Sequence, residues 1–186
     1  MVEEILQEVR ALMKKAVDSL RRDLSAIRTG RASTSMLEHV RVEYYGNVTP
    51  LNQVATMGVP EPRLITIRPW EQKMIPVIEK AIRTDKNLGL NPSSDGTLIR
   101  VPIPELTEER RREIAKVARQ RAEEGRVAVR HGRHEGMELV AAALKDGDVS
   151  EDEAHHAQTE IQKLTDEFVA QVDEVARHKE AEIMEV

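Results

Sequence analysis

Apolar residues recur every three or four positions along three long stretches of the chain, a spacing typical of amphipathic α-helices. The first stretch predicts a helix over residues 2–28, ended by Gly30 as a C′ glycine. The second and longest predicts a helix over residues 107–145. The third begins at Ser150, which forms a predicted capping box with Glu153. Since only the second and third helices have a short connection, the pattern predicts an elongated three-helix bundle.

The apolar face of the second predicted helix consists mainly of small residues. Its expected members are Ile114, Ala118, Ala122, Gly125, Ala128, Gly132, Gly136, Leu139 and Ala143. Each glycine inside a helix costs about 1 kcal/mol of helix propensity relative to alanine. We therefore expect this helix to depend on close packing against its neighbours.

Between the first and second helices the hydrophobic period changes from that of a helix to that of a strand. Residues 39–45 alternate, with Val40, Val42 and Tyr44 on one side, and Gly46-Asn47 is expected to turn the chain. Further short strands are expected at residues 48–51, 54–57, 64–68 and 98–103, separated by glycines and prolines, with one helix after Trp70. The chain is therefore predicted to be an α+β protein. An inserted β/α/β sandwich domain, residues 31–105, would interrupt a bundle made of residues 1–30 and 106–186.

Basic residues follow the second helix at helical spacing. Residues 110–133 contain eight arginines, one lysine and three glutamates, whereas the whole chain has a net charge of -5. Arginine is suited to phosphate because its planar fork can donate two hydrogen bonds at once. A solvated charged face is the alternative interpretation. The candidate RNA-binding residues are Arg112, Lys116, Arg119, Arg126, Arg130 and Arg133.

The third helix has the opposite charge. Residues 150–186 contain eleven Asp and Glu against three Lys and Arg. A bundle with one basic and one acidic helix is expected to have an uneven charge distribution and to approach a polyanion from one side.

The chain shows little sign of catalytic chemistry. It has no cysteine, no apolar run long enough to span a bilayer and no N-terminal targeting pattern, which favours the cytoplasm. No phosphate-binding glycine loop is present, and His131 and His134 have no obvious third metal ligand. Neither an enzyme activity nor a cofactor nor a metal is predicted. A coiled-coil adaptor and a metal-dependent hydrolase remain as alternatives.

Several short motifs, in order along essentially the whole chain, closely resemble those of the bacterial ribosome recycling factor family. They are residues 27–33 (IRTGRAS), 42–47 (VEYYGN), 88–92 (LGLNP), 99–104 (IRVPIP), 106–111 (LTEERR), 126–130 (RVAVR), 150–152 (SED) and 162–166 (QKLTD).

The resemblance implies an L-shaped molecule, similar in outline to a transfer RNA, that acts as a monomer in the cytoplasm. It also implies the partners: the ribosome, as 50S or 70S particle, and GTP-bound elongation factor G. With that factor the protein would split the post-termination ribosome into subunits and release messenger and transfer RNA. Contacts to large-subunit ribosomal RNA are implied for Arg130 and Arg133. The sequence departs from the family pattern nearby, where His134 stands in place of a basic residue.

Two segments connect the predicted bundle to the inserted domain. Glycine accepts large backbone rotations, whereas proline fixes φ and limits how a segment bends. Gly30 and Arg31 on the outgoing segment, with Pro102 and Pro104 on the returning one, are therefore expected to form a hinge between the two domains.

Overall fold

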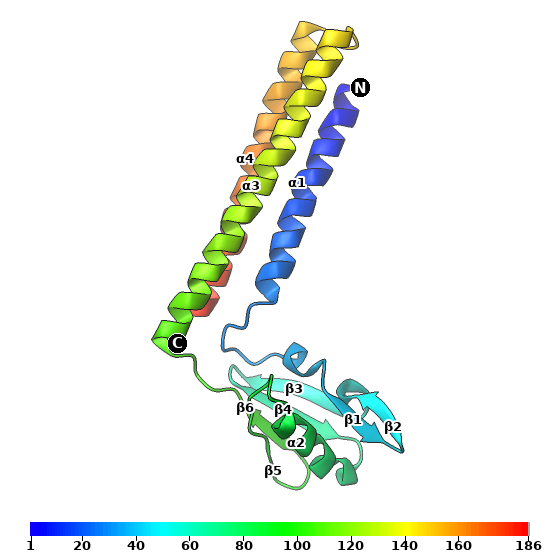
Figure 1. Ribbon diagram of the computed structural model, residues 1–186, viewed down its shortest axis with the longest axis vertical. Coiled ribbons are helices and arrows are strands. Elements are labelled where there is room, and N and C mark those ends of the chain that lie inside the picture. Colours follow the sequence, from blue (N-terminus) through cyan, green and yellow to red (C-terminus); the bar gives the residue numbers. More distant parts are fainter. Residues whose placement is uncertain (186) are drawn as a thin grey trace. The chain divides into compact units, whose positions relative to one another are not determined.

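The computed structural model describes residues 1–185 of the chain. These residues form two compact units, shown in Figure 1. One contains Met1–Thr29 together with the segment from Glu108 onward, and the other is Gly30–Thr107. The first is a bundle of long helices, and the second combines two sheets with one helix.

The bundle consists of α1 (Val2–Ser25), α3 (Glu108–Asp146) and α4 (Glu151–Met184). As Figure 1 shows, α3 runs antiparallel to both α1 and α4. With 39 residues, α3 is about 58 Å long at the rise of an α-helix. The side chains at the centre of the bundle are fully buried and come from all three helices: Val9, Met13, Val17, Val129, Ala157, Ile161 and Val172.

The helix α1 ends earlier than its hydrophobic period predicts. It stops at Ser25, where the Ser25 hydroxyl donates to the Arg22 carbonyl oxygen at 2.7 Å. A serine that bonds its own last turn competes with the helical backbone, and Ile27 N–H closes the end on the Leu24 carbonyl at 3.1 Å. Gly30 is therefore not the C′ residue of α1, and the prediction of a helix to residue 28 is wrong.

The turn between α3 and α4 is fixed by hydrogen bonds at both ends, and the capping box at its second end was predicted. Gly147 has φ +79°, and Asp148 N–H donates to the Ala143 carbonyl at 2.9 Å, which is the bonding of a Schellman motif. On the other side, the Ser150 and Glu153 side chains each accept from the other residue's backbone N–H, so the capping box is confirmed.

Glycines of α3 allow α1 to approach closely. A Cβ built on Gly125 would lie 3.1 Å from Leu20 Cδ2, and one on Gly136 would collide with Val9 Cγ2. A Cβ on Gly132 would meet Met13 Cγ at 3.3 Å. The expected dependence of α3 on its neighbours is thus explained by small residues that bring two backbones together.

Two members of the predicted apolar face of α3 lie on the outside. Val129 and Val140 are buried, whereas Ala128 and Leu139, the residues predicted for the core, are exposed. A helix can continue its apolar face after Gly125 by a step of three or of four residues, and here the step of four points inward. The sequence period alone did not decide between these neighbours.

The Gly30–Thr107 unit contains a hairpin and an antiparallel four-stranded sheet. The hairpin pairs β1 (Arg41–Tyr44) with β2 (Asn47–Pro50). The sheet has the order β3-β4-β6-β5, with β3 Ala55–Glu61, β4 Leu64–Pro69, β5 Ser93–Ser94 and β6 Ile99–Pro102. The helix α2 (Ile75–Thr84) has Pro76 in its first turn, where a missing N–H is tolerated, and packs against β1 and β5. The most deeply buried side chains of this unit are Leu37, Ile65, Ile67, Ile78, Ile82, Ile99 and Val101.

Two details of the strands differ from the prediction. The hairpin turn is Tyr45-Gly46, both with positive φ, and Tyr44 pairs with Asn47, so the turn lies one residue earlier than expected. The strand β3 continues through Gly58 and Pro60, which were expected to end it. Since β3 is an edge strand with a register shift between Gly58 and Glu61, a proline without an N–H is accommodated there.

Candidate nucleic-acid interface

Six basic side chains of α3 lie on one side of the helix and form what we call the arginine sector. The steps between them are four, three, seven, four and three residues, which at about 100° per residue keeps them within an arc of roughly 100°. The members are Arg112, Lys116, Arg119, Arg126, Arg130 and Arg133. Five are exposed, and Arg126 is the exception, with 27% of its side chain accessible.

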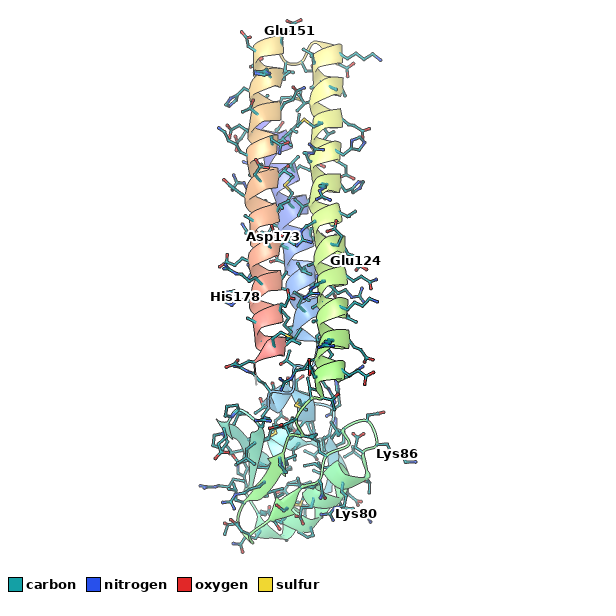
Figure 2. The ribbon with its side chains drawn as sticks, turned by 90° about the vertical axis from the view of Figure 1, so that its left-hand side faces the viewer. Lys80, Lys86, Glu124, Glu151, Asp173 and His178 are labelled. Carbon is teal, nitrogen blue, oxygen red and sulfur yellow. The ribbon has the colours of Figure 1, made fainter. Side chains whose placement is uncertain are left out.

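Three members of the sector contact α4 at regular intervals. The Nε atom of Arg119 donates to Glu180 Oε1 at 2.9 Å. One heptad further along α3, Arg126 Nε donates to Asp173 Oδ1 at 2.8 Å. Another heptad on, Arg133 Nη1 donates to Gln162 Oε1 at 3.3 Å. These contacts form a row along the junction of α3 and α4, where Asp173 is labelled in Figure 2.

This row adds to the expectation of an uneven charge distribution, because it shows where the charges of the two helices meet. Acidic side chains of α4 lie directly beside the arginine sector, because antiparallel helices bring residues spaced by sevens into repeated contact. The hydrogen bond to Glu180 raises the pKa of Arg119. The pKa of Arg126 is raised mainly by its hydrogen bond to Asp173 and further by the one to Glu123. Part of the positive charge of α3 is therefore balanced by α4 and does not face solvent alone.

A groove of about 420 Å³ opens between the two helices, beside the part of the row that runs from Asp173 to Gln162. Arg130 and Arg133 line it from α3. From α4 it is lined by Gln162, Thr165, Asp166, Val169, Ala170 and Asp173. The two arginines to which RNA contact was assigned thus share one concave surface, and 55% of the Arg130 side chain is accessible.

One glutamate on α3 connects two arginines of the sector. Glu123 Oε2 accepts from Arg126 Nη1 at 2.9 Å, and Glu123 Oε1 accepts from Arg130 Nη1 at 3.4 Å. The arginines were recognisable in the sequence, but the roles of Glu123, Asp173 and Glu180 were missed. The heptad spacing of Asp173 and Glu180 was a signal that could have revealed their pairing with α3.

The end of the sector near the start of α3, at Arg112 and Lys116, has a different environment. Arg112 is paired within its own helix, with its Nη2 at 2.5 Å from Glu108 Oε1, and 75% of its side chain is accessible. A second hollow there is lined by Glu108, Glu109, Arg112, Glu113 and Lys116. Acidic residues of the first helical turn are therefore mixed with the basic ones at this end.

The two histidines of α3 each face a glutamate one turn later. His131 Nε2 lies 3.0 Å from Glu135 Oε1, and His134 Nε2 lies 3.3 Å from Glu138 Oε1. Across residues 1–185, no three His, Asp or Glu side chains come together as a metal site would require. No helix in the same part of the chain is both long and apolar enough to cross a membrane.

The expected hinge residues lie at both ends of the Gly30–Thr107 unit. Gly30 has φ +80°, and a Cβ there would come within 3.0 Å of Leu106 Cγ. On the returning segment, Pro102 belongs to β6 as the register partner of Leu64, and Ile103 N–H donates to the Arg63 carbonyl at 2.8 Å. The sheet therefore holds the chain as far as Ile103, and Pro104 is the first proline beyond it.

Comparison with known proteins gives one consistent family. Residues 20–184 match the family model described as ribosome recycling factor. The ribosome-recycling factor of Anaeromyxobacter dehalogenans (strain 2CP-C) is 55% identical, over 99% of this chain and 97% of its own. That of Geobacter metallireducens is 52% identical over the full length of both chains.

Solved structures agree in sequence and in fold. A solution structure of the ribosome recycling factor superposes with a TM-score of 0.73 and 43% identity, covering 100% of this chain and 98% of the other. A second structure is the T. thermophilus factor, described with E. coli elongation factor G bound to the E. coli post-termination complex. It superposes with a TM-score of 0.63 and 46% identity over the full length of both chains. A helical bundle with an inserted α/β unit is thus the architecture of translation factors of this type. The chain belongs to the ribosome recycling factor family, and the resemblance drawn from its motifs is confirmed.

Proposed function

We propose that this chain binds the post-termination ribosome and, with elongation factor G and GTP, promotes its splitting into subunits. Messenger and transfer RNA are then released, and the subunits are recycled. The observation that supports this most directly is the full-length similarity to the T. thermophilus factor described together with elongation factor G on a post-termination complex. As a partner of the ribosome, the protein would act in the cytoplasm, as a monomer.

The exposed members of the arginine sector, Arg112, Lys116, Arg119, Arg130 and Arg133, are the proposed contact to large-subunit ribosomal RNA, in the 50S particle and in the 70S ribosome. RNA duplexes are recognised mainly through shape, phosphates and 2′-hydroxyls, because their major groove is too narrow for side chains. Arg130 and Arg133 suit this role, since both are exposed and line one groove. Lys116 and Arg112 would extend the contact toward the start of α3.

The test is a double charge reversal, Arg130→Glu with Arg133→Glu. We expect co-sedimentation with vacant ribosomes to weaken strongly, while helical content and melting temperature stay those of the wild type. Each lost phosphate contact should also reduce the slope of log affinity against log salt by roughly one unit. The matched control reverses Arg10 and Lys14, which are exposed on α1 and give the same change of net charge.

Equal losses from the two double reversals would show that only net charge matters and would remove Arg130 and Arg133 from the interface. Binding that survives the Arg130 and Arg133 reversals would have the same meaning. A subunit-splitting assay with elongation factor G and GTP extends the test from binding to function. A wild-type protein that binds but splits no ribosomes would contradict the proposed function itself.

We also propose that the chain has no enzyme activity of its own and that GTP is hydrolysed by elongation factor G. Membership of a translation factor family supports this assignment. The purified protein is expected to release no phosphate from GTP until elongation factor G and ribosomes are added. Turnover by the protein alone that persists through repurification would overturn this assignment.

The hinge residues are proposed to let the Gly30–Thr107 unit rotate during splitting. The positive φ of Gly30 supports this, because other residues adopt that backbone conformation only with strain. On the returning segment, rotation would be confined to residues after Ile103, including Pro104, since Pro102 is part of β6. Gly30→Ala is therefore expected to slow splitting while ribosome binding is retained. Splitting at the wild-type rate by a folded Gly30→Ala protein would argue against the hinge.

A further inference from the structure

The arginines of the sector differ in how much of each is available to a ligand. Arg126 is the least exposed, and its guanidinium already contacts two carboxylates, Asp173 at 2.8 Å and Glu123 at 2.9 Å. These hydrogen bonds hold the pKa of Arg126 above its ordinary value. With Nε and one Nη bound to carboxylates of the protein itself, this side chain is poorly placed to grip a phosphate with its fork.

The same contacts continue to a residue that is well placed for phosphate. Glu123 uses its second oxygen to accept from Arg130 Nη1 at 3.4 Å, and Arg130 lies at the edge of the α3–α4 groove. Four side chains therefore form one network: Asp173, Arg126, Glu123 and Arg130. Its two end members, Asp173 on α4 and Arg130 on α3, both line the groove. The two positive and two negative charges of the network balance.

We infer that Asp173, Arg126 and Glu123 are positioning residues for RNA binding, which orient Arg130 toward a phosphate without contacting RNA themselves. A long arginine side chain that is free in solution loses conformational entropy when a ligand fixes it. Contacts that hold it beforehand reduce this cost, which is the general advantage of preorganisation. Arg126 also offsets the charge of Glu123, which alone would repel a phosphate near Arg130.

This inference rests on the proposed function, and it makes a prediction opposite to that of simple electrostatics. Replacing Asp173 by asparagine removes a negative charge from the neighbourhood of a polyanion. If Asp173 acted only through its charge, RNA affinity would rise. If Asp173 positions Arg130 through Arg126 and Glu123, affinity falls although the protein has become more positive. The sign of the change therefore separates the two explanations.

The matched control is Glu124→Gln. Glu124 contacts Arg121 on its own helix at 3.0 Å, and Figure 2 shows it on the side of α3 away from α4, at a level similar to that of Asp173. Both substitutions remove one negative charge from a paired carboxylate side chain that is about half accessible, 54% for Asp173 and 52% for Glu124. Only Asp173 belongs to the network that ends at Arg130. A general effect of charge on affinity would therefore appear in both variants.

The experiment measures co-sedimentation with vacant ribosomes over a range of salt concentrations. Asp173→Asn is expected to lower affinity roughly three- to tenfold, the size that one or two partly exposed ion pairs can produce. Its salt slope should stay that of the wild type, because no phosphate contact is lost. Glu124→Gln should bind as the wild type does or slightly more tightly. Arg130→Gln, by contrast, should reduce both the affinity and the slope.

Two further variants separate positioning from a general loss of structure. Arg126→Lys keeps the charge but loses the planar fork whose separate nitrogens hold Asp173 and Glu123. It should therefore lower affinity as Asp173→Asn does, with the melting temperature unchanged. In a double-mutant cycle, Asp173→Asn should have no further effect once Arg130 is glutamine. Conversely, Asp173→Glu should restore most of the affinity.

An Asp173→Asn protein that binds as tightly as Glu124→Gln would overturn the inference, and so would effects that add in the double-mutant cycle. Neither result would touch the proposed function, which requires only that the wild type binds and that Arg130 contributes. Failure of the wild type to co-sediment with ribosomes would instead reject the proposed function.

Discussion

The two sides of α3 are built on different principles. Toward α1, glycines replace side chains, and the backbones meet through Gly125, Gly132 and Gly136. Along the junction with α4, long arginines reach carboxylates across a surface that remains open to water. The contact between α3 and α1 depends on close packing, so it tolerates little change. The ion pairs between α3 and α4 can rearrange. The adaptable side is also the one that carries the proposed RNA-binding residues.

The largest effect is expected for Gly136→Ala, which tests the close packing of α3 against α1. Alanine has the higher helix propensity by about 1 kcal/mol, so in an open helix it would stabilise the protein. Here its Cβ would collide with Val9 Cγ2 and come within 3.1 Å of Ile161 Cδ1. We expect a net loss of about 1–3 kcal/mol in the free energy of unfolding, measured by urea denaturation.

Gly132→Ala is the matched control for that substitution. Its Cβ would meet the flexible Met13 side chain at 3.3 Å, which can move, so the loss should be much smaller or absent. Combining Gly136→Ala with Val9→Ala should recover part of the lost stability, because the clashing methyl group is gone. A Gly136→Ala protein more stable than the wild type would show that the two helices are not packed this closely.

On the other side of α3, Arg119→Gln should have a much smaller effect on stability. The side chain is 69% accessible, and exposed ion pairs contribute little because water and salt screen them. We expect the melting temperature to change by no more than about 2 °C. A loss as large as that of Gly136→Ala would mean that the α3–α4 contact is as rigid as the glycine face, and the contrast would disappear.

The smallest expected effect concerns the turn that joins α3 to α4 and depends on pH. The backbone N–H of Ser150 holds the pKa of Glu153 below its ordinary value of 4.5. Because the folded-state pKa is lowered, the stabilisation is present above that ordinary value and is lost as the pH falls through the folded pKa. The melting temperature of Glu153→Gln should therefore lie below that of the wild type at pH 7, and the two should converge as the pH falls through the folded-state pKa of Glu153.

Glu151→Gln provides the comparison for that experiment. Glu151, labelled in Figure 2, lies in the same helical turn, and its substitution removes the same charge while the charged Glu153 acceptor of the capping box stays in place. Its difference from the wild type should vary less with pH between 7 and 3. Identical pH profiles for the two variants would assign the effect to the helix dipole rather than to the capping box.

Local patterns predicted much of this fold, since many of its elements are specified by neighbouring residues. The hydrophobic periods, the capping box at Ser150 and the helix after Trp70 were all recognised in the sequence. The errors arose where tertiary context decides. Pro60 continues β3 because that strand happens to be an edge, and Val129 rather than Ala128 is buried because of where α1 and α4 lie.

The candidate site was predictable only in part, for a similar reason. The spacing of arginines along α3 is visible in the sequence, but the environment of each one depends on α4. Whether an arginine is partly enclosed, as Arg126 is, or open, as Arg130 is, follows from which residues of α4 lie opposite. The spacing of residues along α3 does not show which residues of α4 lie opposite them.

The register between α3 and α4 also determines where the row of contacts ends. Residues seven apart drift by about 20° around a straight helix, so such a row stays aligned over successive heptads only if the two helices wind gently around each other. One heptad before Arg119 lies Arg112, which continues the spacing of the row along α3. Arg112 pairs instead with Glu108 of its own helix. The register between α3 and α4 thus decides which arginines of α3 are held by the neighbouring helix and which pair within their own.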